Sequence, residues 1–287
     1  MANTLNTGVY REEWMTKLQE RLDRPTSWMD ACDVIFSSAQ IFNVPYMATE
    51  FTDASGTRGT AYSFSDFTLT NDTLTVNTFR IAPVFIDRAD MAQCQYATQM
   101  EMADRQGRVL KERVETAFLG THANWTDIGD SGGSIVSGST SPITVSATSI
   151  DDIIRETRAL IIAANGGDLM ERNGLCFVWR AQDFKFLEQY AQANGFNLAD
   201  YALKTGIPNG YFFLGAYHYI SNNHTAGHVF GGVRRIVKVG ILNSTWGQIV
   251  TTQDPNLQSG IGVIARADYG FLTPTAHATL VRDINVA

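Results

Sequence analysis

A long uninterrupted helical stretch is the feature that most constrains how this chain can fold. No proline occurs between Pro83 and Pro142, and the segment 85–120 repeats small or apolar residues at steps of three and four, the spacing of one helix face. The residues on this face are Ala89, Ala92, Tyr96, Met100, Ala103, Gly107, Leu110, Val114 and Ala117. At about 1.5 Å per residue, some 30 residues form a rod on the order of 45 Å long. We therefore expect a sheet or a neighbouring molecule to pack along this rod.

The composition excludes several classes of protein. A chain of 287 residues with 44% hydrophobic content can bury a substantial core. Its formal net charge of −7, with five lysines against 17 arginines, argues against a basic face that grips nucleic acid. Three cysteines, Cys32, Cys94 and Cys176, are too few and too scattered for a disulfide framework or a CxxC metal site. Since no signal peptide or membrane span is evident, we expect a soluble chain without a membrane partner.

A short amphipathic helix is predicted near the amino terminus, ending before Pro25. Its narrow apolar stripe consists of Tyr10, Trp14, Leu18 and Leu22, which recur at every fourth position. A lone helix of this length is marginal in water, so its stripe must dock either on the chain's own core or on a neighbour.

Residues 48–86 alternate aromatic, threonine and valine residues with polar ones and predict a long β-hairpin. We place the turn at Asn71 and Asp72 and a bulge near Asn77. Only one face of this ribbon is apolar, and a two-stranded ribbon of this kind is at best marginally stable alone. It needs a further surface on which to lie.

The second half of the chain gives the clearest secondary structure. The Gly- and Ser-rich segment 127–146 predicts a mobile or solvent-facing connection. After it we expect a helix from Ser149 to Asn165, a strand at 175–179 buried on both faces, a helix at 181–193, and a strand at 211–220. Short strands follow to the carboxyl end, so the fold class is α+β with helices packed on a mixed sheet.

One short motif raises the possibility of catalysis. The sequence GDSGG at 129–133 resembles the nucleophile loop of chymotrypsin-type serine proteases. A catalytic Ser131 needs a histidine and an aspartate upstream, each on a separate strand. His122 is the one upstream histidine and stands only nine positions away, so a serine hydrolase remains an alternative that the spacing disfavours.

Other motifs predict no catalytic, cofactor or metal site. His224 and His228 have the spacing of metal ligands on a helix, but they lie in a segment rich in Asn and Gly without a third ligand nearby, so we interpret them as surface loop histidines. His218 lies in an aromatic strand and is expected in a core or an interface. The GIGVIA sequence at 260–265 precedes a strand instead of the helix that a dinucleotide loop requires.

Taken in order, the arm, hairpin, rod, Gly/Ser connection, helix-strand-helix unit and closing strands resemble the major capsid proteins of tailed bacteriophages that share the HK97 fold. The resemblance implies an N-arm at 1–47, an E-loop hairpin at 48–86, a peripheral domain at 87–148 whose spine helix runs from Asp87 to Leu119, an axial domain at 149–255, and closing strands of the peripheral domain at 256–287. It also implies a structural protein and not an enzyme. Such a protein forms the pentamers and hexamers of an icosahedral virion shell around double-stranded DNA, and is made in the host cytoplasm.

Seven residues are candidates for contacts between subunits. We expect Arg58 and Arg80 to be charge partners, and the others to be apolar anchors, although each could instead pack within its own chain. The full set is Tyr10, Trp14, Leu18, Arg58, Phe67, Leu69 and Arg80.

The resemblance also indicates how such a shell is held together. Because 48–86 contains no lysine, the isopeptide link that some family members form there is not expected, and the shell should be noncovalent. Further expected partners are a separate scaffold, a portal and, as a candidate stabiliser, a cement protein. DNA inside is enclosed without sequence-specific binding. The nearest alternative is an encapsulin, a nanocompartment shell of the same fold that encloses an enzyme.

Overall fold

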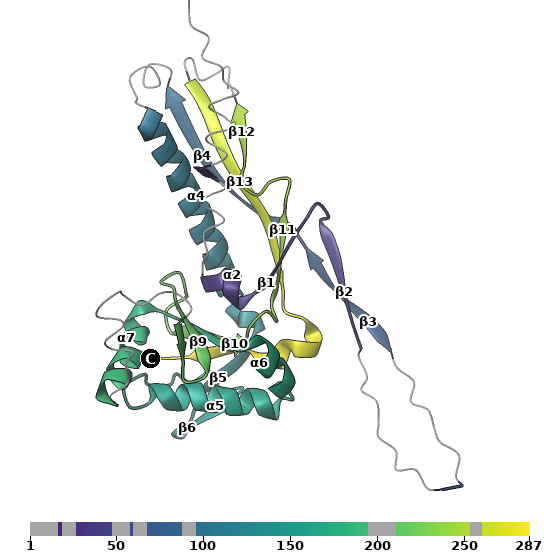
Figure 1. Cartoon of the computed structure of the whole chain (residues 1–287), viewed down its shortest axis with the longest axis vertical. Coiled ribbons are helices and arrows are strands. Elements are labelled where there is room, and N and C mark those ends of the chain that lie inside the picture. Colours follow the sequence, from purple (N-terminus) through teal and green to yellow (C-terminus); the bar gives the residue numbers. More distant parts are fainter. Residues whose placement is uncertain are drawn as a thin grey trace, which may run out of the picture.

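The structure is a computed structural model that describes residues 17–18, 27–47, 58–59, 68–87, 96–194, 211–252 and 260–287. Figure 1 shows an elongated upper body in which a long helix runs beside a sheet, a rounder lower body, and a two-stranded ribbon that projects away from the point where the bodies meet. Among the described residues, no helix combines the length and the apolar character needed to cross a membrane.

The long helix is α4, Tyr96–Leu119. Its predicted apolar face is confirmed where the structure describes burial, because Ala103, Leu110 and Val114 are fully buried. The predicted start at Asp87 is wrong, since Asp87 ends a strand, β4, and pairs with Gly260. The described helix has 24 residues and is about 36 Å long at 1.5 Å per residue.

A five-stranded sheet lies along α4. Its strands are β1 (Asp33–Ser37), β4 (Thr78–Asp87), β11 (Lys238–Leu242), β12 (Gln248–Thr252) and β13 (Gly260–Leu272). The order is β1-β11-β13-β12, with β4 also paired to β13, and β1 runs parallel to β11 while the other pairs are antiparallel. The amide of Gln106 on α4 donates hydrogen bonds to the carbonyl oxygens of Ala82 on β4 (2.7 Å) and Val263 on β13 (3.2 Å). These bonds fix the helix to the sheet.

The projecting ribbon consists of β2 (Ile41–Met47) and β3 (Leu69–Thr75), paired antiparallel. The predicted turn is wrong, because Asn71 and Asp72 lie inside β3, opposite Pro45 and Val44. The predicted bulge near Asn77 is also wrong. The chain there leaves β3 and enters β4, and so passes from the ribbon into the five-stranded sheet.

A seven-stranded sheet forms the centre of the lower body. Its strands are β5 (Thr126–Ser131), β6 (Ser134–Ser137), β7 (Leu175–Trp179), β8 (Tyr211–Phe213), β9 (Ala216–Ile220), β10 (His228–Val233) and β14 (Val281–Asn285), in the order β6-β5-β14-β10-β7-β9-β8. The prediction of a doubly buried strand is confirmed, since every residue of β7 is buried. The predicted strand at 211–220 is instead a tight hairpin, which turns through Leu214 and Gly215 at φ values of 50° and 75°.

Helices cover both faces of the seven-stranded sheet. The helices α5 (Ile150–Ala163), α6 (Gly167–Asn173) and α7 (Ala181–Ala193) belong to the lower body, where α5 contacts α7 and β10. The end of α4 and the short helix α2 (Ser27–Ala31) lie on the opposite face, where Phe118 packs on Phe230 at 5.7 Å between ring centroids. The predicted α5 and α7 are confirmed, and α6 was not predicted. The Ser149 hydroxyl donates to the carbonyl oxygen of Thr144 (2.8 Å) and does not cap α5.

Strand pairing divides the chain differently from the predicted domain ranges. The segment interpreted as a mobile connection forms β5 and β6, which belong to the seven-stranded sheet. Within the range expected for the axial domain, β11 and β12 belong to the five-stranded sheet. Of the two closing strands, β13 joins the five-stranded sheet, whereas β14 lies in the middle of the other one. The chain therefore crosses between the two sheets more often than the linear order of elements indicates.

Candidate assembly surfaces

In the described part of the chain, α4 covers one face of the five-stranded sheet, and the base of the ribbon covers the other face only at β11 and the end of β13. On β4, Ala82 and Val84 pack against the core on the side of α4, and their partners on β13, Ala265 and Val263, are buried. Alternate residues of β4 are exposed, as the two faces of a strand require. The exposed apolar residues of this face are Phe79, Ile81 and Phe85 on β4 and Val250 on β12. We call these four residues the open face.

The open face is continuous across the sheet. Pro83 on β4 pairs with Ile264 on β13, and Ile264 pairs with Val250 on β12, so the three side chains form one row. Ile81 is 50% exposed and Phe85 is 46% exposed. Arg266 pairs with Ile81 and its guanidinium lies 4.9 Å from the centre of the Phe79 ring, so a charged pair, Arg266 with Asp268, borders the apolar row. An exposed apolar surface with a polar rim indicates a contact site for another protein or another copy.

The ribbon carries a second exposed apolar surface. Ile41, Met47 and Leu69 are all exposed, and Met47 lies directly opposite Leu69 in the strand register. Directly opposed side chains on one face of an antiparallel pair are close neighbours. The outer end of the described ribbon therefore presents an apolar pair that its own chain does not cover.

The base of the ribbon is fixed to the upper body. Asp72 on β3 accepts two hydrogen bonds from Thr275, one from the backbone amide (2.7 Å) and one from the hydroxyl (2.9 Å). A Cβ atom on Gly240 of β11 would lie 3.2 Å from Leu74 and 3.3 Å from Phe42, so the ribbon packs tightly there. These contacts set the direction in which the ribbon leaves the molecule.

The candidate interface residues from the sequence have different environments. Leu69 is 62% exposed on the ribbon, and Arg58 is exposed in a turn. Arg80 is exposed, and its Nε donates to the Tyr269 hydroxyl at 3.4 Å. Leu18 is fully buried in the core of its own chain, so the intramolecular alternative describes it. Tyr10, Trp14 and Phe67 lie outside the described residues.

Sequence reasoning missed the open face as an interface. At this point of the chain the sequence predicted only a bulge near Asn77. The signal that could have found the open face is the alternation of Phe79, Ile81 and Phe85 with small residues, which predicts one large apolar face and one face that receives a helix closely.

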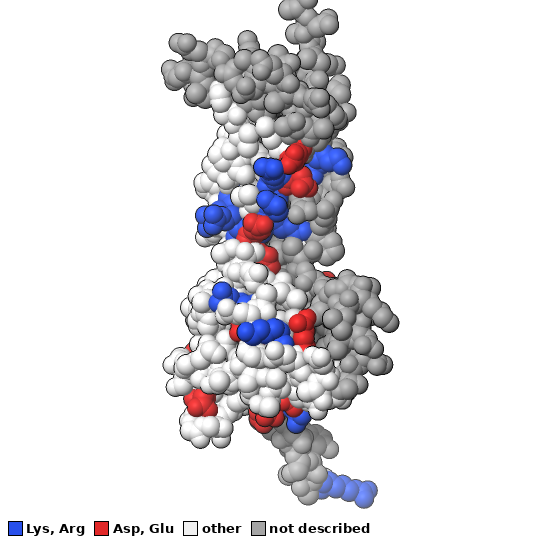
Figure 2. Space-filling view, turned by 90° about the vertical axis from the view of Figure 1, so that its left-hand side faces the viewer, with Lys and Arg blue, Asp and Glu red and all other residues white. Residues whose placement is uncertain are grey.

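The surface over α4 is charged instead of apolar. Figure 2 shows side chains of both signs gathered on this side of the upper body. Two pairs on α4 have the spacing of one helical turn: Arg105 with Glu101 (2.6 Å) and Arg108 with Glu112 (3.8 Å). Exposed pairs contribute little to stability, about 0.3–0.5 kcal/mol each. They keep this face of the helix solvated.

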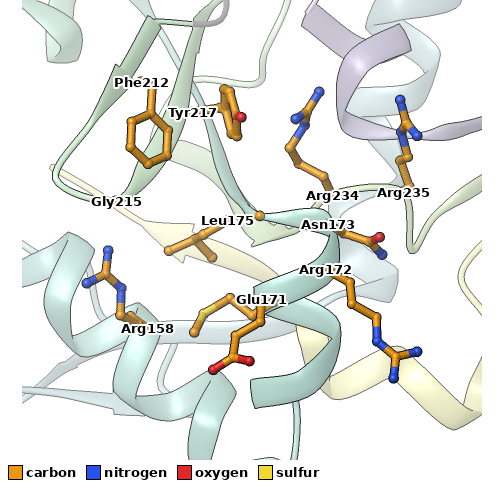
Figure 3. Close-up of a pocket in the computed structure, with 12 residues that line it drawn as sticks. Arg158, Glu171, Arg172, Asn173, Leu175, Phe212, Gly215, Tyr217, Arg234 and Arg235 are labelled. Carbon is orange, nitrogen blue, oxygen red and sulfur yellow. The ribbon is translucent and has the colours of Figure 1, made fainter.

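A cavity of about 600 Å³ lies between α6, the β8–β9 hairpin and the turn after β10. Figure 3 shows four arginines around it, Arg158, Arg172, Arg234 and Arg235. Arg158 donates to the carbonyl oxygen of Leu214, and the Arg234 guanidinium lies 4.2 Å from the centre of the Tyr217 ring. Its lining contains no histidine, serine or cysteine, so it brings no nucleophile and base together.

Ser131 does not belong to a catalytic arrangement in the described part of the chain. It ends β5 at a hairpin turn formed by Gly132 and Gly133, whose φ values are 62° and 88°. Asp130 accepts the amide hydrogen of Gly133 (3.0 Å) and so stabilises this turn. The nearest upstream histidine, His122, faces Asp283 (Nδ1 to Oδ2, 3.1 Å). The GDSGG motif is therefore a glycine turn in a β-hairpin.

The interpretation of His224 and His228 as surface loop histidines is wrong. His224 is 4% exposed, and His228 begins β10 with its Nδ1 2.8 Å from Asp283. The prediction for His218 is confirmed, because it lies in the core between Trp179 and Phe213. The Trp179 indole donates to His218 Nδ1 (3.0 Å), and His218 Nε2 donates to the Phe213 carbonyl oxygen (3.0 Å). Burial lowers the pKa of His218 to about 4, so the ring is neutral.

Comparison with known proteins shows similarity in structure and not in sequence. No protein-family model and no curated protein matches the chain. A structure of Mycobacterium phage Che8 is similar at 14% identity and a TM-score of 0.64, over 86% of this chain and 85% of that one. The capsid of an empty gene transfer agent particle is similar at 12% identity and a TM-score of 0.61, over 90% and 88%. A virus-like particle from Pyrococcus furiosus is similar at 10% identity and a TM-score of 0.58, over 96% and 99%.

These similar structures cover most of this chain and most of their own length. Identities this low establish the fold alone. The mixture of helices and strands and the order of elements agree with the α+β class expected from the sequence. This chain has the HK97-type fold found in phage capsid proteins.

Proposed function

We propose that the chain is a major capsid protein that assembles with copies of itself into the pentamers and hexamers of an icosahedral phage head around double-stranded DNA. The observation that carries this proposal is the open face together with the exposed end of the ribbon. Both carry large apolar side chains that are exposed in the described part of the chain. Copies of the chain are the natural cover, because head-to-tail contacts between different patches generate closed rings.

The shape of the molecule supports this proposal. The ribbon leaves the junction of the two bodies and extends away from both (Figure 1). A projecting element of this kind reaches a neighbour more readily than its own core. Each contact can be modest, since several simultaneous contacts per subunit give strong overall binding.

The charge of the chain fits a container for DNA. The formal net charge of −7 disfavours tight binding of the packaged polymer to the wall. A noncovalent shell remains our expectation, because residues 48–86 lack a lysine. Scaffold, portal and cement proteins, synthesis in the host cytoplasm and location in the virion belong to the same proposal.

Expression of the full chain tests self-assembly directly. Size-exclusion chromatography and negative-stain microscopy should show rings or closed shells, with or without an added scaffold. Boiling in detergent should dissociate these particles into single chains. A chain that stays monomeric at high concentration with scaffold present contradicts the proposal, and covalent ladders contradict its noncovalent part.

An encapsulin-type shell is the second candidate. It is favoured by the similarity to the virus-like particle from Pyrococcus furiosus, which extends over 99% of that chain. This alternative predicts small uniform shells from the subunit alone that retain a host enzyme and no genome. Nuclease-protected DNA in particles from infected cells would instead favour the phage head.

A further inference from the structure

Four titratable side chains outside the assembly surfaces converge where the end of α4 meets the seven-stranded sheet. His122 lies in the short 3-10 helix η1 (Gly120–Asn124) that follows α4. His228 begins β10, Asp283 is in β14, and His224 lies in the turn before β10. We call these four residues the histidine cluster.

Two imidazoles of the cluster face one carboxylate oxygen. Asp283 Oδ2 is 3.1 Å from His122 Nδ1 and 2.8 Å from His228 Nδ1. The rings of His122 and His228 are tilted by 33° with their centroids 4.1 Å apart, and the His224 ring lies 6.3 Å from that of His122. Three side chains from separate elements therefore direct ligand atoms toward one point.

Two members of the cluster are buried without adequate hydrogen bonds. Asp283 is 1% exposed, and its Oδ1 has no hydrogen-bond partner. His224 is buried, and neither ring nitrogen makes a well-formed hydrogen bond. An unsatisfied buried polar atom is costly, and an unpaired buried charge costs more. A cation bound by the Asp283 carboxylate would compensate this buried charge.

The ligand atoms fit a divalent transition metal ion. The candidate atoms of His122, His228 and Asp283 lie within 4.8 Å of one another. Tetrahedral zinc with bonds of about 2.0–2.1 Å to nitrogen and oxygen has ligand atoms about 3.3 Å apart. The separations of 3.1 and 2.8 Å need to open by only a few tenths of an ångström. Imidazole ligands select zinc and its neighbours over magnesium and calcium, which prefer oxygen.

We propose that His122, His228 and Asp283 bind one Zn²⁺-type divalent ion, with the buried His224, whose ring lies 6.3 Å from that of His122, as the candidate fourth ligand. The ion would join the segment after α4 to two strands of the seven-stranded sheet. A ligand that binds only the folded chain stabilises it by mass action. The site would therefore clamp the long helix to the lower body, whether or not the chain forms shells.

Metal binding to the full-length chain tests the proposal. Chelator-treated protein would be titrated with Zn²⁺ by calorimetry, and with Co²⁺ by visible absorption, which reports tetrahedral coordination. We expect one equivalent per chain and a rise in Tm of several degrees. The double variant His122→Gln/His228→Gln should weaken binding by at least about 100-fold, since loss of even an outer-shell partner costs about 10- to 100-fold.

The matched control is His277→Gln, which makes the same change in the half-buried 3-10 helix η2 (Thr275–Leu280), away from the cluster. It should bind the ion as the parent chain does. Absence of binding by the parent chain, or equal binding by the parent and the double variant, overturns the proposal.

If the double variant does not fold, X-ray absorption at the zinc edge of the unsubstituted chain identifies the atoms that coordinate the ion. A first shell of nitrogen and oxygen with at least two imidazoles supports the site. A shell containing sulfur, or six oxygens, overturns it.

Discussion

Removal of two large side chains from the open face should block assembly without unfolding the subunit. The double variant Ile81→Ser/Phe85→Ser replaces side chains that are 50% and 46% exposed in the isolated chain. Full burial of an isoleucine or phenylalanine contributes about 1.5–3 kcal/mol. About half of that remains for a neighbour to gain, so the pair contributes about 1.5–3 kcal/mol to each contact.

The expected loss is large enough to measure in an assembly assay. Because about 1.4 kcal/mol is a tenfold change in an equilibrium constant, each contact should weaken by roughly 10- to 150-fold. Light scattering over a concentration series would give the concentration at which particles first form. Circular dichroism of the unassembled variant should match that of the parent chain.

Ile162→Ser on α5 is the matched control. Ile162 is equally exposed, at 50%, but lies on a helix of the lower body. It should leave the assembly concentration within a fewfold of the parent value. The reasoning is refuted if the double variant assembles at the parent concentration, or if the control shifts it as far.

Three further predictions concern the ribbon, the core and the sheet junction. Asp72→Ala removes the two hydrogen bonds at the base of the ribbon, at a cost of about 1–3 kcal/mol. Amide hydrogen exchange in β2 and β3 should therefore accelerate. Unchanged exchange would show that this anchor does not hold the ribbon. His218 has its pKa lowered by burial to about 4, against about 6.5 in an unfolded chain, so the unfolded state binds more protons between these values. Stability should be complete above about pH 6.5 and fall by about 3 kcal/mol as the pH drops to 4, and His218→Gln should flatten this part of the denaturation profile. Gly270→Ala places a methyl group against a backbone carbonyl of β3 and should lower the free energy of unfolding in urea by more than about 2 kcal/mol. Gly120→Ala is the control, because Gly120 has open space around it and the change should be neutral. Equal effects of the two variants would contradict this packing.

Local sequence signals predicted those elements whose partners lie nearby in the chain. The helix α5, the buried strand β7 and the helix α7 carry strong periodicity and clear ends, and the structure has each of them where the pattern placed it. The apolar face of α4 was read equally well, because a helix face repeats every three to four residues whatever packs on it.

The elements that the sequence did not predict correctly are those whose structure depends on contacts with distant parts of the chain. Asn71 and Asp72 resemble a turn, but Asp72 continues a strand and binds Thr275, about 200 positions later. The glycines at 132 and 133 were read as part of a linker because their segment is rich in serine, whereas they close a hairpin whose first strand pairs with β14. A partner at the far end of the chain leaves no periodic signal.

The histidine cluster shows the same limit for a candidate site. Asp283 lies 161 positions from His122 and 55 from His228. His224 and His228 are close in the sequence and were visible as a candidate pair. Because no third ligand lies near them in the sequence, they were interpreted as surface loop histidines. Parallel pairing of β5 with β14 brings the segment after α4 beside Asp283. Sheet topology, and not closeness in the sequence, therefore brings His122 and Asp283 to the other two histidines.

The seven-stranded sheet mainly stabilises the folded subunit, whereas the five-stranded sheet carries the surface proposed for assembly. Both faces of the seven-stranded sheet are covered by the chain's own helices, and β7 and β14 are buried throughout. Among the described residues, the five-stranded sheet has one face covered by α4 and the other covered only where the base of the ribbon packs on it, and the rest of the ribbon carries exposed apolar side chains. Large-to-small changes in the first sheet should therefore unfold the subunit, at about 2–5 kcal/mol each. Changes on the open face should leave the subunit folded, because their energetic cost appears only when a neighbour is present to make the contact.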